Sequence, residues 1–241
     1  MRFTIYGFFS VIASIVFLSI FDVFNFKFLA ILLAAILGQN VMCEHCGDKY
    51  VMSSYISLLT ILVCIFENCS RIKNFVVAFS LLAAIGRIGC LFTGCCTGKE
   101  TNQSGIIYRG NYLINKKLNK KIVKVKPTIL YEIFIQFLLA ILFIKYQQLY
   151  ILFPILNAIL IYITNKWRLT YRMGKNKNLS PILLIISFFI ILFKCQNLNN
   201  TNNRITFKFK NVYIIISLFL GLILSNDINI SYVKKKLKIS K

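Results

Sequence analysis

Residues 75–98 read FVVAFSLLAAIGRIGCLFTGCCTG, and this stretch decides the class of fold. Residues 75–92 form an apolar run that one charge, Arg87, interrupts. A helix that crosses a bilayer needs about 20 apolar residues. A cation inside such a helix is costly and usually marks a functional site. Because closely spaced glycines and three cysteines follow, we predict a membrane helix that ends in a functional site.

Comparable apolar runs recur along the 241 residues, of which 58% are hydrophobic, with a mean hydropathy of +0.71. These values lie far above those of an ordinary soluble domain. The candidate spans are residues 3–21, 28–42, 51–66, 75–92, 128–144, 149–164, 181–193 and 212–225. The third contains serines and the last two are short. We therefore predict an all-α polytopic membrane protein with seven to eight transmembrane helices, folded as a single integral-membrane domain over residues 1–241.

The first run resembles a signal peptide only superficially. Arg2 alone precedes it, and no small-x-small cleavage site comes before Asp22. We therefore expect it to be a retained first span.

The net charge of +22 comes from basic residues in the connections between apolar runs. This distribution favours contact with anionic lipid headgroups and argues against nucleic-acid binding. With eight spans, one side of the membrane would carry 20 Lys and Arg and the other side 8. The richer side, which includes residues 94–127, would be cytoplasmic by the positive-inside rule.

Eight cysteines are present, at positions 43, 46, 64, 69, 90, 95, 96 and 195. Cys64 lies within a span and is expected to be a small buried apolar residue. Cys43 and Cys46 form a C-x-x-C pattern that suits a redox pair or half of a metal site. His45, between them, is the only histidine, which excludes mechanisms that need two.

Further charges lie at the ends of neighbouring spans. Residues 126–132 read KPTILYE, with Pro127 at a helix start and Glu132 in the first turns of an apolar helix. Glu132 would pair with Arg87 or interact with the helix dipole. Arg87 itself would clamp a phosphate or snorkel to a carbonyl. Lys166, Arg168 and Arg172 would supply a second phosphate-binding cation or belong to an aromatic belt.

Residues 86–98 resemble the signature of prolipoprotein diacylglyceryl transferases, in a cysteine-containing variant. Tyr6-Gly7, KPTILYE, Lys166-Trp167 and Leu179-Ser180 are similar to further family motifs in the same order. The resemblance covers residues 4–190, and residues 195–241 add a polar stretch, an apolar run and a basic tail.

The resemblance implies transfer of the diacylglyceryl group of phosphatidylglycerol to the lipobox cysteine of a prolipoprotein signal peptide, with release of glycerol phosphate. It implies a multi-pass protein of the bacterial cytoplasmic (inner) membrane, among membrane lipids, whose signature faces outward, and we adopt that orientation. No cofactor and no metal are expected. The implied catalytic residues are Arg87, Glu132 and Tyr131. The implied substrate-binding residues are Tyr6, Gly86, Gly89, Cys90, Gly94, Cys95, Gly98 and Lys166.

Several positions depart from the family pattern. Cys90 and Cys95 replace an asparagine and a glutamate, and Lys126 replaces a histidine. Another histidine of the family pattern would fall near Met52, where this chain has none. The general base is therefore unassigned. Two alternatives stay open: a membrane thiol-disulfide redox protein that uses Cys43/Cys46 and Cys95/Cys96, and a non-catalytic lipid-binding relative.

Overall fold

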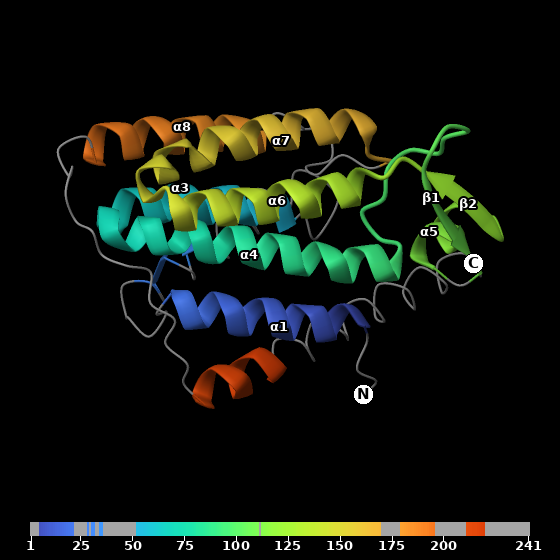
Figure 1. Ribbon diagram of the computed structural model, residues 1–241, viewed down its shortest axis with the longest axis horizontal. Coiled ribbons are helices and arrows are strands. Elements are labelled where there is room, and N and C mark those ends of the chain that lie inside the picture. The colour runs from blue at the N-terminus through green and yellow to red at the C-terminus, as the bar shows by residue number, and fades with distance from the viewer. Residues whose placement is uncertain are drawn as a thin grey trace.

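The computed structural model describes residues 5–21, 52–110, 112–169, 179–195 and 211–219, with residues 28, 30, 31, 34 and 35. Long helices lie side by side along one axis (Figure 1). They are α1 (Ile5–Ile20), α3 (Met52–Phe66), α4 (Cys69–Thr93), α6 (Thr128–Lys145), α7 (Phe153–Trp167) and α8 (Leu179–Cys195). The short 3-10 helix η1 (Gln147–Leu152) leads into α7.

Three helical segments of the described chain are long and apolar enough to cross a membrane: Cys69–Thr93, Thr128–Lys145 and Gln147–Trp167. They contain three of the predicted spans. α1 and α8 are apolar but shorter, as is most of α3. Seven to eight spans therefore stay a prediction. Residues 28–42 lie largely outside the described residues, as does the last part of the run 212–225, from residue 220 onward. Cys43, His45, Cys46 and Arg172 lie wholly outside them.

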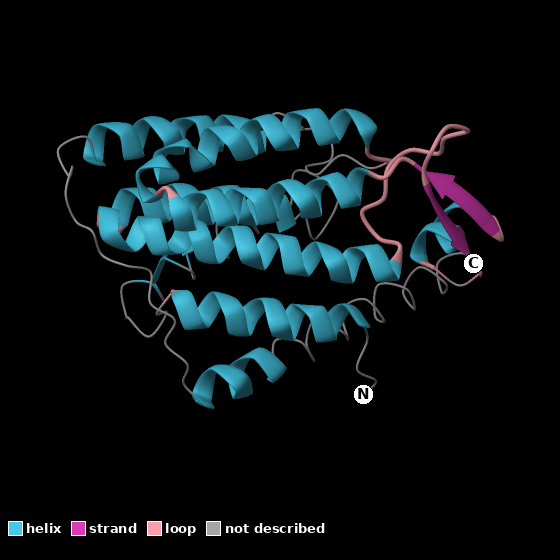
Figure 2. Cartoon of the chain, viewed as in Figure 1, coloured by secondary structure: helices cyan, strands magenta, loops and turns pink. Residues whose placement is uncertain are grey.

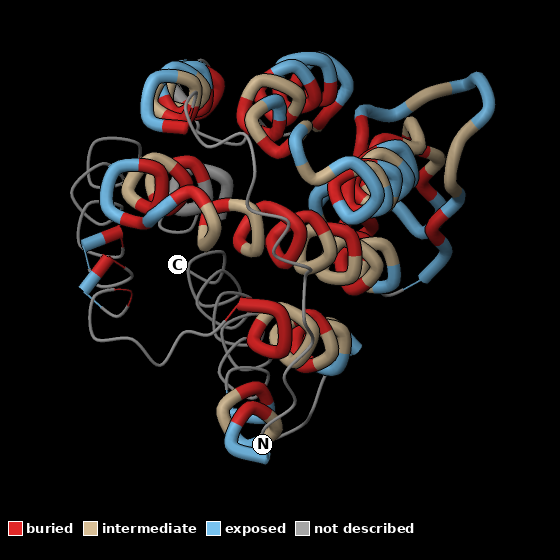
Figure 3. The backbone as a smooth tube through the Cα atoms, turned by 60° about the vertical axis from the view of Figure 1, so that its left-hand side comes forward, coloured by how far each residue is buried: buried red, intermediate tan, exposed pale blue. Residues whose placement is uncertain are grey.

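Helix α4 is the centre of the bundle, packed between α1 and α6, while α8 packs against α7 and α3. In the helices, buried positions alternate with exposed ones along the backbone, as expected when one side of each helix packs on its neighbours (Figure 3). The main core contains stacked and edge-to-face aromatic rings, among them Phe75, Phe79 and Phe153. This packing holds the first half of α4 against neighbouring helices, and the signature lies at its other end.

The connection after α4 contains a small β unit that the sequence analysis did not predict. β1 (Ile106–Arg109) pairs antiparallel with β2 (Ile122–Val125), and α5 (Leu113–Leu118) lies between them in the chain (Figure 2). Tyr108, Val123 and Val125 point into a small core. The Tyr108 hydroxyl donates to the Leu91 carbonyl of α4 at 3.1 Å. The chain is thus mostly helical rather than all helical, and the β unit is attached to the end of α4.

A disulfide joins Cys69, at the start of α4, to Cys195, at the end of α8. It closes a loop across a sequence separation of 126 residues. It lies at the opposite end of α4 from the signature. This pairing is not predictable from the sequence, because spacing alone does not reveal which helix ends meet.

We expect Cys195→Ser to lower the free energy of unfolding by about 4 kcal/mol, because a long cross-linked loop restricts the unfolded chain. Denaturant unfolding in detergent micelles would measure this loss. Wild-type protein treated with a reductant should lose the same amount. Equal stability of the oxidised wild type and the variant would contradict the prediction.

Candidate functional site

Arg87 and Glu132 form a buried ion pair between α4 and α6. Arg87 Nε lies 2.9 Å from Glu132 Oε2, and the Glu132 side chain is 2% exposed. Arg87 retains some access, with 20% of its side chain exposed. The ion pair anticipated from the sequence is therefore present. A charged pair inside an apolar bundle is stable only when each charge has a partner.

Arg168, directly after α7, is a second cation at the same carboxylate. Its Nη1 lies 4.0 Å from Glu132 Oε1, and its Nη2 donates to the Cys96 carbonyl at 3.0 Å. The residue is only 4% exposed. The family resemblance had pointed instead to Lys166, which is exposed and lies with Nζ 4.6 Å from the centre of the Tyr162 ring. The structure thus brings Arg87, Glu132 and Arg168 together and places Lys166 outside this cluster.

The segment 97–101 holds the end of α7 against the signature. The Lys99 amide donates to the Trp167 carbonyl at 2.7 Å, and the Leu169 amide donates to the Thr97 carbonyl at 3.2 Å. Gly98 also lets this segment approach the start of α6, since a Cβ there would lie 2.5 Å from the Lys126 carbonyl oxygen. Backbone pairing between segments distant in sequence therefore explains why hydropathy and spacing did not single out Arg168.

The other signature glycines have different roles. Gly94 ends α4 in the left-handed conformation, with φ 67°. Gly89 lets α1 approach, because a Cβ there would lie 3.3 Å from Cδ2 of Tyr6. A Cβ at Gly86 would meet nothing within 4 Å among the atoms described. The space beside Arg87 is thus open at Gly86 and closed by Tyr6 at Gly89.

Several donors at the cluster are available to a ligand. Among the residues that the structure describes, none accepts a hydrogen bond from the two Nη groups of Arg87. Arg168 Nε and Thr128 Oγ1 are buried and likewise have no described hydrogen-bond partner. A Cβ at Gly98 would lie 2.7 Å from Thr128 Oγ1, so this hydroxyl faces the signature loop. Buried polar groups in proteins are nearly always satisfied, so unused donors here favour an anionic ligand.

Cys90, Cys95 and Cys96 converge beside the two arginines, with their Sγ atoms within 4.8 Å of one another. Hydrogen bonds from Cys90 and Cys95, with the nearby guanidinium groups of Arg168 and Arg87, hold the pKa of Cys96 well below its usual value. Hydrogen bonding to Cys90 and Cys96 raises the pKa of Cys95 well above its usual value. Burial, with Cys95 nearby, raises the pKa of Tyr108 to about 12. The cluster thus favours one thiolate among protonated neighbours.

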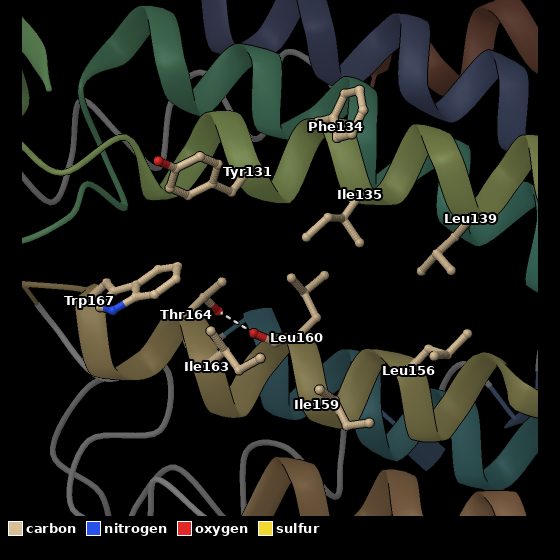
Figure 4. A pocket seen from close by; sticks show the side chains of 10 residues that line it. All are labelled: Tyr131, Phe134, Ile135, Leu139, Leu156, Ile159, Leu160, Ile163, Thr164 and Trp167. Carbon is tan, nitrogen blue, oxygen red and sulfur yellow. Dashed lines mark hydrogen bonds between the residues drawn. The ribbon is translucent and has the colours of Figure 1, made fainter. Parts of the chain in front are cut away.

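Tyr131 precedes Glu132 on α6, and its side chain faces α7. Its ring meets the Trp167 ring edge to face, with 5.9 Å between centroids. Both rings lie at one end of an apolar groove of about 530 Å³ between α6 and α7 (Figure 4). Ile135, Leu139 and Leu156 are among the side chains that line its length. The groove therefore begins next to the charged cluster and continues along the apolar bundle.

Comparison with known families agrees with this arrangement. A family model described as prolipoprotein diacylglyceryl transferase matches residues 56–195, more than half of the chain. The chain belongs to this family. Arg87, Glu132, Arg168 and the three clustered cysteines all lie in the matched segment, whereas Tyr6 precedes it. No curated protein and no solved structure matches the chain. The resemblance noted from the sequence is confirmed, and the chain is a membrane protein of a diacylglyceryl transferase family.

Proposed function

We propose that the protein transfers the diacylglyceryl group of phosphatidylglycerol to the lipobox cysteine thiol of a prolipoprotein signal peptide. Glycerol phosphate would leave, and the reaction would take place in the bacterial cytoplasmic membrane. The observation that carries the proposal is the geometry of Arg87. Glu132 holds its Nε at 2.9 Å while both Nη groups have no described acceptor.

Arg87 is suited to stabilise the departing phosphate. A guanidinium binds phosphate through two parallel hydrogen bonds and keeps its charge when it is removed from water. Glu132 fixes the direction of this donor in advance, so that little reorganisation accompanies bond breaking. Arg168 Nε and Thr128 Oγ1 add unused donors near Gly98. The chemistry of the leaving group is thus matched by residues from α4, α6 and the end of α7.

The groove between α6 and α7 is suited to an acyl chain of the donor. Its lining is almost entirely apolar, and it begins at Tyr131 and Trp167, beside Glu132 and Arg168 in the chain. Aromatic rings of this kind commonly sit at the level of lipid headgroups. In this arrangement Tyr131 orients the donor where its headgroup joins its acyl chains. Tyr6 and the glycines at 86, 89, 94 and 98 shape the space around Arg87.

Transfer can be tested directly in bacteria depleted of their own enzyme. The chain should restore lipidation of a marker lipoprotein, measured by gel shift and incorporation of labelled lipid. With purified protein, phosphatidylglycerol should serve as donor and phosphatidylethanolamine should not. Absence of lipidation by stable, inserted protein would reject the proposal. Reversible disulfide formation at Cys95 and Cys96 in that protein would favour the thiol-redox alternative.

We expect Arg168→Gln to slow transfer by about 100-fold, the cost of removing one preorganised donor. Lys166→Gln should slow transfer much less, by a few-fold at most, because exposed charges contribute little. Initial rates with equal amounts of inserted protein would measure both changes. A larger loss from the Lys166 variant would show that Lys166, and not Arg168, is the second functional cation.

A further inference from the structure

Cys90, Cys95 and Cys96 are brought together by the way α4 ends. Cys90 lies in the last turn of α4, and Gly94 reverses the chain in the left-handed conformation. The Cys95 amide then donates to the Cys90 carbonyl at 3.2 Å. Cys96 also has a positive φ of 55°, which is uncommon for a residue with a side chain. The backbone thus brings Cys95 and Cys96 back beside Cys90.

The resulting group has the chemistry of a thiophilic metal site. The three Sγ atoms lie within 4.8 Å of one another. Three thiolates bound to tetrahedral zinc at about 2.3 Å would be about 3.8 Å apart, so small side-chain rotations would suffice. Thr93 Oγ1 lies 3.2 Å from Cys95 Sγ, where it can donate to a ligating sulfur.

The surrounding charge also suits such a site. Three thiolates and one Zn²⁺ carry one net negative charge, which must be compensated in an apolar bundle. Arg87 lies three residues before Cys90 on α4, so the two share a helix face. Arg168 binds the carbonyl of Cys96. Two cations therefore flank the sulfur atoms.

We propose that Cys90, Cys95 and Cys96 bind one Zn²⁺ ion through three thiolates and leave its fourth position open to the thiol of the acceptor cysteine. This differs from the metal-free site expected from the sequence, and it rests on the proposed transfer activity for the role of the fourth position. Three protein ligands with one exchangeable position are the pattern of catalytic zinc. In the described residues, the group contains no fourth ligand.

No general base is assigned in this site, and zinc would promote deprotonation of the acceptor thiol in its place. A thiol that coordinates zinc loses its proton, here to water. The sulfur electron pair then attacks the glyceryl carbon that carries the phosphate oxygen. The C–S bond forms, the C–O bond breaks, and its electron pair leaves with glycerol phosphate beside Arg87. No oxidant or reductant is needed.

The test begins with metal binding, using full-length protein in detergent without a histidine tag. After reduction and removal of metal, one Zn²⁺ per chain should bind. Co²⁺ in its place should show sulfur-to-cobalt charge-transfer bands and tetrahedral d–d bands. Cys96→Ser should weaken binding at least 100-fold, whereas Cys64→Ser should not, because Cys64 is a free cysteine on α3 away from the cluster. Addition of a lipobox peptide should change the Co²⁺ spectrum, and its Cys→Ser form should not.

The outcomes separate this site from the proposed function. Failure to bind Zn²⁺, binding of Cu⁺ alone, or equal binding by the Cys96 variant would overturn the zinc proposal. Unchanged transfer after metal removal would also overturn it while leaving the transferase intact. Specific zinc binding and a peptide-dependent spectrum without any lipid transfer would support the site and reject the transferase.

Discussion

Arg87→Ala should lower the rate of diacylglyceryl transfer by about 10³-fold, the upper end for loss of one preorganised donor to a developing charge. The variant removes the guanidinium that Glu132 holds at 2.9 Å. Arg87→Lys should restore part of the rate, because it returns a point charge but not the two parallel donors. The measurement is the initial rate of labelled-lipid transfer to a lipobox peptide, at equal amounts of inserted protein.

Arg109→Ala is the matched control for this variant. Arg109 is an exposed arginine on β1, outside the charged cluster, and its loss should leave the rate unchanged. Arg87→Ala protein that transfers lipid within about fivefold of the wild-type rate would contradict the role of Arg87. A fivefold change corresponds to about 1 kcal/mol, which an ordinary surface charge already contributes.

The helices around the site could be predicted because membrane spans follow from composition. The runs at residues 75–92, 128–144 and 149–164 correspond to α4, α6 and η1 with α7, since a bilayer requires long apolar segments with internal hydrogen bonds. The β unit at residues 106–125 was missed because its strands are four residues each. The alternation of apolar and basic residues from Val123 to Lys126 was the available signal.

The charged pair was predictable for a different reason. One arginine and one glutamate within apolar helices must find partners, so Arg87 and Glu132 could be paired from chemistry alone. Arg168 could not be separated from Lys166 and Arg172 in this way. The placement of the Arg168 side chain at Glu132 depends on the backbone bridge between Gly98 and Arg168, which are distant in sequence. The cysteine cluster likewise depends on two left-handed residues, Gly94 and Cys96, rather than on spacing.

Glu132→Gln should destabilise the protein by about 3 kcal/mol, because it leaves two guanidinium groups in the bundle without their shared carboxylate. The amide keeps the size of the side chain, so the loss would report charge rather than packing. Denaturant unfolding in micelles would measure the free energy. Lipid transfer should fall as well, since Arg87 would no longer be held in place.

Glu100→Gln provides the same substitution at an exposed ion pair. Glu100 Oε2 lies 2.6 Å from Lys120 Nζ, with both side chains largely open to solvent. Its loss should cost at most about 1 kcal/mol. In a double-variant cycle, adding Arg168→Gln to Glu132→Gln should cost less than the two single changes together, because one uncompensated cation is removed. Equal losses at positions 100 and 132, or strict additivity, would show that Glu132 does not hold the two arginines, and the phosphate site would then lack its organising charge.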